Sequence, residues 1–76
     1  MNAVYLTRID PAHNMARYYA MSLQPTLFGE CSVVREWGRI GRGGQVRETC
    51  HTTEGEAQVF VAHILRQKGR KGYKIT

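Results

Sequence analysis

The chain has 76 residues, enough for one small domain with a modest core, because a chain of this length buries only about 60% of the surface that its unfolded form exposes. A hydrophobic content of 42% argues against intrinsic disorder, and no segment approaches the roughly 20 consecutive apolar residues that cross a bilayer. Eleven Lys and Arg against six Asp and Glu give a net charge of +5, which favours an acidic partner such as nucleic acid but is also found in basic proteins without one.

The N-terminus has no basic leader followed by a long apolar run, so we predict no secretory signal. Two cysteines, Cys31 and Cys50, are too few for a disulfide framework, and we expect a cytoplasmic protein in which both thiols are free and half-buried. The cysteines and histidines lack the CxxC or HxxxH spacing of metal sites. The sequence also shows no nucleophile motif and no spaced pair of carboxylates. We therefore expect no metal, no cofactor, no small-molecule substrate and no catalytic activity.

Two strands joined by a turn are predicted at the start of the chain. Residues 4–9 are rich in β-branched and aromatic side chains, and residues 10–14 then break the strand with a proline, Asp and Asn. In the second strand, residues 15–23, Arg17 and Tyr19 share one face and Tyr18 takes the other. We expect an antiparallel hairpin in which one of the two tyrosines packs on the sheet and the other covers its rim.

A connection over residues 24–30 leads to the central strand. Leu27 and Phe28 are its apolar residues, and we expect both to dock on the core and hold the connection against the sheet. The central strand begins at about Cys31. A glycine-rich turn over residues 41–44 joins it to a partner strand over residues 45–51, because glycine adopts the backbone conformations that tight turns need.

The central strand carries the most distinctive residues of the chain. Because strand side chains alternate, Arg35, Trp37 and Arg39 point to one face and Glu36 points to the other. Burying the whole indole between two arginines would draw charge into the core, so we predict a partly exposed Trp37. Together with Arg42 in the turn, this strand end could bind nucleic acid through aromatic stacking and arginine–phosphate pairs. Alternatively, the arginines stack on the indole and stabilise the fold.

One amphipathic helix is predicted over residues 53–68. Thr53 and Glu56 form a capping box at its start. Apolar residues then recur at helical spacing on one face, at Ala57, Phe60, Val61, Ile64 and Leu65. We expect Gly69 to take the left-handed position just past the end of the helix, and residues 72–76 to form a short last strand or an extended tail.

Basic residues concentrate near the C-terminus, at Arg66, Lys68, Arg70, Lys71 and Lys74. They could face phosphates, or they could form a solvated face that complements the helix dipole. We assign Arg66 and Lys68 to the solvated face. Lys71 and Tyr73 are the stronger candidates for contact with nucleic acid.

These residues resemble a known family. Trp37-Gly38-Arg39, followed by Ile40-Gly41 and the glycine turn, is similar to the motif of the WGR domain. The resemblance covers the whole chain, with further matches at Arg17-Tyr18-Tyr19, Leu27-Phe28-Gly29, Gln45, Ala57, Phe60 and Lys71-Gly72-Tyr73. WGR domains occur in poly(ADP-ribose) polymerases, where this Trp and Arg lie at a DNA break, and as short stand-alone bacterial proteins. Ala16 departs from the pattern, because some DNA-binding members carry a polar residue there.

The elements and the resemblance together predict an α+β fold, a twisted antiparallel sheet of four to five strands with one α-helix packed across one face, in a single WGR-like domain over residues 1–76. The resemblance implies sequence-nonspecific binding of duplex DNA or DNA ends. The candidate contacts are Trp37, Gly38, Arg39, Arg42, Arg17, Lys71 and Tyr73. The alternative is a protein–protein interaction module that uses the Trp37 surface as an anchor. The chain has no counterpart of the polymerases' catalytic domain, so we expect no transfer of ADP-ribose.

Overall fold

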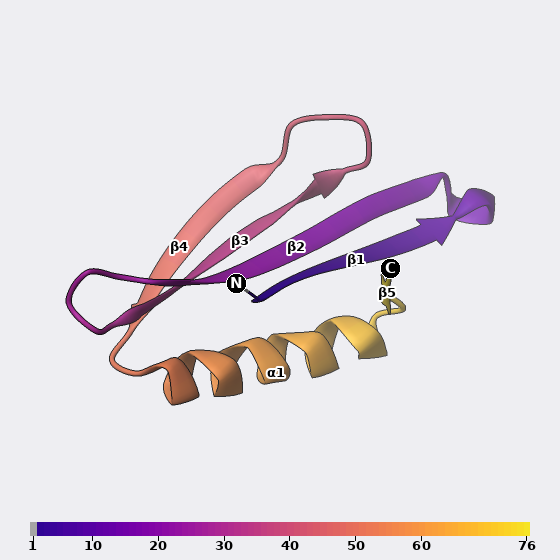
Figure 1. Cartoon of the computed structure of the whole chain (residues 1–76). Coiled ribbons are helices and arrows are strands. Elements are labelled where there is room, and N and C mark those ends of the chain that lie inside the picture. The colour runs from indigo at the N-terminus through magenta and orange to yellow at the C-terminus, as the bar shows by residue number, and fades with distance from the viewer. Residues whose placement is uncertain (1) are drawn as a thin grey trace.

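The computed structural model describes residues 2–76 and shows a twisted five-stranded antiparallel sheet with one helix across one face (Figure 1). The order of the strands in the sheet is β4-β3-β2-β1-β5. The predicted α+β fold is therefore confirmed. In chain order the elements are β1 (Asn2–Asp10), the short 3-10 helix η1 (Pro11–His13), β2 (Met15–Pro25), β3 (Cys31–Arg39), β4 (Gln45–His51), α1 (Glu54–Arg70) and β5 (Lys74–Ile75).

The first hairpin is paired along its whole length. Its register runs from Asp10 opposite Met15 at the turn to Asn2 opposite Leu23 at the far end. Between the strands, η1 begins with a proline and is followed by Asn14, whose φ of 51° is left-handed. Asn tolerates this conformation better than most residues, which is why the chain can reverse there.

The loop between β2 and β3 corrects one prediction. Leu27 and Phe28 do not dock on the core, because 98% and 88% of their surfaces are exposed. The Thr26 hydroxyl accepts hydrogen bonds from the backbone N–H groups of Phe28 (3.3 Å) and Glu30 (3.2 Å), and the Thr26 N–H donates to the Glu30 carbonyl (2.9 Å). Because these bonds satisfy the loop's own backbone, it needs no contact with the sheet to hold its shape.

Helix α1 confirms the Thr53 half of the predicted capping box and the predicted buried face. The Glu56 N–H donates to the Thr53 hydroxyl at 3.1 Å. Ala57 and Ile64 are buried, while Phe60, Val61 and Leu65 are half-buried against the sheet. No helix in the described part of the chain is long and apolar enough to cross a membrane.

The end of the helix was placed wrongly. Gly69 lies inside α1, which continues to Arg70, and the left-handed residue is Gly72, with a φ of +95°. The Tyr73 N–H donates to the Lys68 carbonyl at 3.0 Å, and the Gly72 N–H donates to the Gly69 carbonyl at 3.1 Å. These bonds close the last turn and direct the chain back to the sheet, where β5 pairs with β1.

The core lies between α1 and the sheet and has two neighbouring parts. One contains Leu6, Tyr19, Met21 and Ile64, and the other contains Leu23, Cys31, Val33 and Ala57. Phe60 and Val61 pack against both parts and so join them. Both cysteines are free as expected, but neither is half-buried, since Cys31 is buried and Cys50 is exposed.

Phe60 is therefore expected to be a main source of stability. Phe60→Ala should lower the free energy of unfolding by about 3 kcal/mol, because it removes apolar contacts from both parts of the core. Val59→Ala is the matched control: Val59 is 70% exposed, and the change should cost less than about 0.5 kcal/mol. Urea denaturation followed by circular dichroism measures both values, and equal effects would show that α1 does not pack as described.

Candidate nucleic-acid interface

Two cross-strand rows of side chains build the candidate site. The register places Leu6, Tyr19 and Trp37 side by side on β1, β2 and β3. The next row on the same face, nearer the turn of the first hairpin, is formed by Arg8, Arg17 and Arg39. Residues that are two apart on a strand share a face, so the arginine row continues the face that packs on α1.

The aromatic part of the site is formed by three neighbouring side chains, those of Tyr19, Trp37 and Tyr73. The rings of Tyr19 and Trp37 stack with their centroids 5.8 Å apart and an interplanar angle of 17°. Tyr73, which follows α1, meets Tyr19 edge-on at 6.5 Å. The Lys68 Nζ lies over both tyrosines, 4.6 Å from the Tyr19 centroid and 5.4 Å from the Tyr73 centroid, within the range of cation–π attraction.

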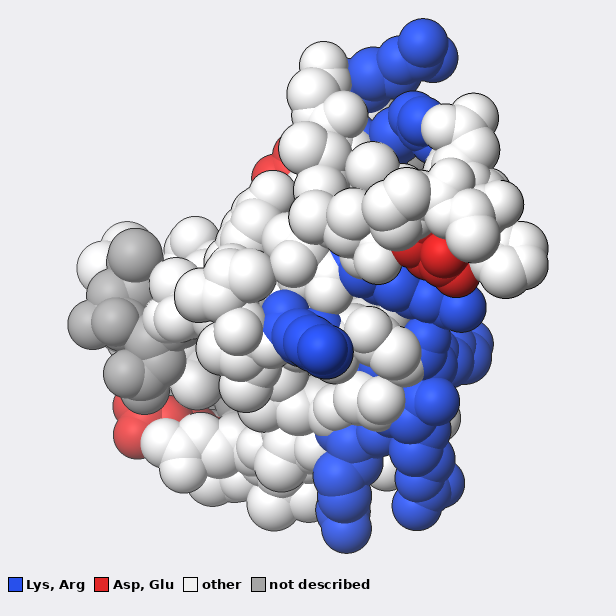
Figure 2. Space-filling model, turned by 90° about the vertical axis from the view of Figure 1, so that its right-hand side faces the viewer, with Lys and Arg blue, Asp and Glu red and all other residues white. Residues whose placement is uncertain are grey.

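These residues enclose an open cleft of about 370 Å³. We call it the cationic cleft, and its lining residues are Arg17, Tyr19, Trp37, Gly38, Arg39, Lys68 and Tyr73. Seen from this end of the molecule, Lys and Arg side chains gather along one side (Figure 2). Within residues 2–76 the only contact between a basic and an acidic side chain joins His13 and Asp10, so no carboxylate neutralises the cations of the cleft. The cleft is therefore suited to an anion.

Arg39 is held in place by the turn of the first hairpin. Its two terminal nitrogens donate to the Asn14 carbonyl (3.2 Å) and to the Asn14 Oδ1 (3.4 Å). A guanidinium has five N–H donors, so these two bonds leave others free for a ligand. The left-handed turn at Asn14 thus orients a guanidinium that the sequence places 25 residues away.

Trp37 is half-buried, which confirms the prediction of a partly exposed indole. One side packs against the core, with Tyr19 stacked on it and the Arg35 guanidinium 5.8 Å from its centroid. Arg35 also lies 5.3 Å from the Phe60 centroid and donates to the Tyr19 hydroxyl at 3.3 Å. Arg35 therefore supports the indole from the core side, whereas Arg39 lines the cleft.

Gly38 and Gly44 allow the end of β3 and the turn that follows it to pack closely together. A Cβ on Gly44 would collide with the Trp37 carbonyl and the Tyr18 hydroxyl, and one on Gly38 would come within 2.9 Å of the Gly44 Cα. Tyr18 is buried on the sheet face opposite α1, where it stacks on Tyr5 with ring centroids 5.8 Å apart. Tyr18 and Tyr19 are thus both buried, on opposite faces of the sheet. The prediction that one of them covers the rim is wrong.

Two groups near the site have shifted pKa values. Burial lowers the pKa of Lys68 below its usual 10.5, and the charges of Lys71 and Arg35 add to the effect. Burial also raises the pKa of the Tyr18 hydroxyl, which donates to Glu36 at 2.9 Å. The Lys68 ammonium is the shifted group that faces the cleft, and an anion beside it would offset the cost of its desolvation.

The structure brings five of the seven predicted contact residues together in the cleft: Arg17, Trp37, Gly38, Arg39 and Tyr73. Arg42 is exposed in the turn, and Lys71 is exposed at the end of α1; neither lines the cleft. Among the residues that the structure describes, no group of His, Cys, Asp and Glu could hold a metal ion.

Sequence reasoning missed Lys68, Tyr19 and Arg8. Lys68 follows Ile64 by four residues, so the helical period places it on the same face as the core residues. The hairpin register would have paired Arg8 with Arg17. In the structure Arg8 lies against Gly72, where an added Cβ would come within 3.4 Å of the Arg8 Nε.

The fold and the cleft define a small α+β module with a cationic, aromatic surface, whose cations have no carboxylate partner among residues 2–76. The family model of the WGR domain matches residues 2–76, and the chain therefore belongs to the WGR domain family. An uncharacterized protein, y4dW, of Sinorhizobium fredii is 46% identical over 71 residues, which cover 93% of this chain and 35% of that relative. The chain thus spans about a third of the length of the curated relative it matches. No solved structure matches the chain. Membership of this family supports a nucleic-acid-binding type of module.

Alanine substitutions at Gly43 and Gly44 test how closely the turn packs against Trp37 and Tyr18. Gly44→Ala should destabilise the fold by about 2 kcal/mol, because the new methyl group must displace the Trp37 carbonyl or the Tyr18 hydroxyl. Gly43→Ala is the control, since nothing lies within 4 Å of a Cβ there and its φ is not positive. Thermal unfolding measures both. A Gly44→Ala protein as stable as Gly43→Ala would mean that the turn does not close on Tyr18.

Proposed function

We propose that this protein binds nucleic acid through the cationic cleft, that its ligand is duplex DNA or a DNA end, and that it does so without catalysis. The observation that carries the proposal is the joint placement of Arg17, Arg39 and Lys68 around the half-buried Trp37, with no carboxylate paired to them in residues 2–76. Family membership supports the same type of function.

The chemistry of the cleft suits a sugar–phosphate backbone. Arginine donates forked hydrogen bonds to phosphate oxygens, and an ammonium adds a compact positive charge. The exposed part of the indole offers an apolar surface on which a deoxyribose or an unstacked terminal base can rest.

The same geometry favours weak sequence preference. Helix α1 packs its apolar face on the sheet, and its C-terminal turn contributes Lys68 to the cleft. No group of helix side chains is therefore placed to read base edges in a groove, which is how helices recognise sequence. Contacts to phosphate and sugar fix position but carry no sequence information.

A protein partner anchored on Trp37 is the alternative use of this surface. It is favoured by the group of three aromatic side chains in the cleft, since aromatic residues are enriched at the anchors of protein interfaces. The two functions differ in their response to salt, because neutralising phosphates releases counterions and burying an aromatic anchor does not.

Salt dependence is the first prediction for this site. If Arg8, Arg17, Arg39 and Lys68 each neutralise a phosphate, affinity for a blunt duplex should fall roughly a hundredfold between about 50 and 200 mM salt. Fluorescence anisotropy of a labelled duplex measures this slope. Binding that does not change with salt, or an absence of binding at low salt, would favour the protein-interaction alternative.

Substitutions of single arginines test whether the phosphates of the DNA lie in the cationic cleft. Arg17→Ala and Arg39→Ala should each weaken binding about tenfold and reduce the salt slope, because each removes a charge-assisted contact. Arg66→Ala is the charge-matched control: Arg66 is exposed and lies two residues before Lys68, about 200° around the helix. Equal losses in all three variants would indicate diffuse attraction and no defined cleft.

The lowered pKa of Lys68 predicts a dependence on pH. Phosphate favours the protonated ammonium, so affinity should fall as pH rises through the Lys68 pKa, which lies below 10.5. Loss of the Lys68 proton does not unfold the protein. Because the pKa of Lys68 is lower in the folded state than in the unfolded state, the free energy of unfolding rises as pH increases from the folded-state pKa to the unfolded-state pKa.

Lys68→Arg is the matched variant, because a guanidinium stays protonated throughout this range. It should keep its affinity where the wild type loses it. Anisotropy titrations at constant ionic strength measure both proteins. Parallel losses in the two proteins would mean that Lys68 does not contact the ligand.

A further inference from the structure

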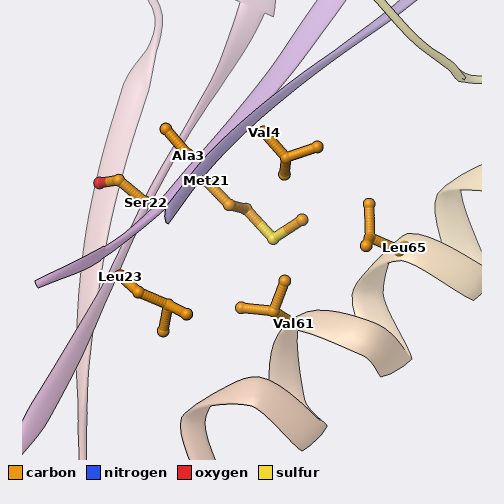
Figure 3. Close-up of a pocket in the computed structure, with 7 residues that line it drawn as sticks. All are labelled: Ala3, Val4, Met21, Ser22, Leu23, Val61 and Leu65. Carbon is orange, nitrogen blue, oxygen red and sulfur yellow. The ribbon is translucent and has the colours of Figure 1, made fainter. Parts of the chain in front are cut away.

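The two faces of the sheet carry opposite charges. Side chains two residues apart on a strand share a face, and paired neighbours continue it across the sheet, as Figure 3 shows where Met21 and Leu23 point towards α1 and Ser22 points away. The face opposite α1, which we call the outer sheet face, bears Glu36 and Glu48 and no Lys or Arg of β1 to β4. The face that packs on α1 bears every arginine of these strands: Arg8, Arg17, Arg35, Arg39 and Arg47.

No cation neutralises the two glutamates of the outer sheet face. Each accepts a hydrogen bond from a neutral hydroxyl, Glu36 from Tyr18 at 2.9 Å and Glu48 from Ser32 at 2.7 Å. Within residues 2–76 neither glutamate forms an ion pair. Lys74 of β5 also belongs to this face, but it lies three strands away from Glu36. The face is therefore locally acidic in a protein whose net charge is +5.

The outer sheet face also offers apolar surface, because α1 lies on the other side of the sheet (Figure 1). A hollow of about 370 Å³ opens on it, and its lining includes Ala20, Val34 and Glu36 from β2 and β3. Val46, which lies beside Glu36 on β4, is exposed. Apolar groups beside two carboxylates without cationic partners suit a partner surface that is both apolar and basic.

Helix α1 carries such a surface on the side that faces away from its own sheet. Its other side is taken up by the core, where Val61 and Leu65 point towards the sheet (Figure 3). The two glutamates of α1, Glu54 and Glu56, lie outside the outward stripe at 100° per residue. That stripe holds four exposed residues at helical spacing: Val59, Ala62, Arg66 and Arg70.

The spacings of the two surfaces match. Glu36 and Glu48 are diagonal neighbours on the paired strands β3 and β4, which places them about 7–8 Å apart. Arg66 and Arg70 are one helical turn apart, which places them about 6 Å apart. Val59 precedes Arg66 by two turns, about 10 Å along the axis. The hollow on β2 lies two strands from Glu48, also about 10 Å.

We propose that two copies of this chain associate head to tail, with the outward stripe of α1 in one copy docked on the outer sheet face of the next. Arg66 and Arg70 of one copy pair with Glu48 and Glu36 of the other, and Val59 enters the hollow. One helix face buries less than the roughly 800 Å² per partner of a stable complex, and the net charge of each copy opposes association. The contact is therefore weak, with a dissociation constant of about 0.1–1 mM.

Symmetric dimers fit these surfaces less well. A two-fold contact between outer sheet faces would gather the glutamates of both copies, and one between outward stripes would gather the arginines of both. A head-to-tail contact joins opposite charges and does not close on itself, so further copies can add to either end. It leaves the cationic cleft open, because Lys68, which α1 contributes to the cleft, lies over Tyr19 on the side of the sheet.

Charge reversal tests the contact by sedimentation velocity at protein concentrations from about 0.05 to 2 mM. The wild type should associate as its concentration rises. Glu48→Lys and Arg66→Glu should each weaken association at least about tenfold, and the double variant should restore it to within about threefold. Recovery in the double variant also shows that the single variants lost a contact and not the fold. Arg42→Glu is the charge-matched control, because Arg42 lies in the exposed turn outside both surfaces, and it should not weaken association.

This proposal and the proposed function can fail separately. Arg39→Ala, which alters the cleft, should associate normally. Val59→Ala changes no charge and should bind a duplex with room for one copy as the wild type does; Arg66→Ala stays a valid control on such a duplex. A wild type that remains monomeric up to about 2 mM, or a double variant that stays monomeric, would overturn the proposal. Association that is lost in Arg66→Glu but kept in Glu48→Lys would also overturn it, since it would indicate a contact between helices.

Discussion

The register of β1, β2 and β3 is the constraint on which the rest of the molecule depends. It places Tyr19 between Leu6 and Trp37, and Arg17 between Arg8 and Arg39. A shift of one residue would turn each of these side chains to the opposite face of the sheet. The face opposite α1 helps to fix the register, because Tyr18 donates to Glu36 across β2 and β3 and packs beside two glycines that admit no Cβ.

The candidate site is arranged for binding at some cost to the fold. Arg35 has a buried Nε without a hydrogen-bond partner among the described residues, and burial lowers the pKa of Lys68. An unpaired donor and a desolvated ammonium both reduce stability. A carboxylate in the cleft would relieve the cost at Lys68 but would also repel phosphate. On our account the bound nucleic acid supplies the missing negative charge.

Local patterns in the sequence predicted the elements well, because helical and strand periods depend on neighbouring residues. The buried face of α1, the cap at Thr53 and the half-exposed Trp37 all followed from spacing. Predictions that needed tertiary information failed. Arg8 joins the site only through cross-strand register, and Lys68 only because α1 crosses Tyr19. Leu27 and Phe28 stay exposed because Thr26 closes their loop, which apolar character alone could not reveal.

Trp37 is the only tryptophan in the chain, so its fluorescence reports directly on the cationic cleft. The most direct test of our account is to add blunt-ended duplex DNA at low salt and follow this emission. We expect the emission to change as the indole contacts the ligand, and to recover when salt is raised and phosphate contacts are lost. DNA binding, detected by anisotropy, that leaves the emission of Trp37 unchanged would place the ligand elsewhere and contradict the central claim.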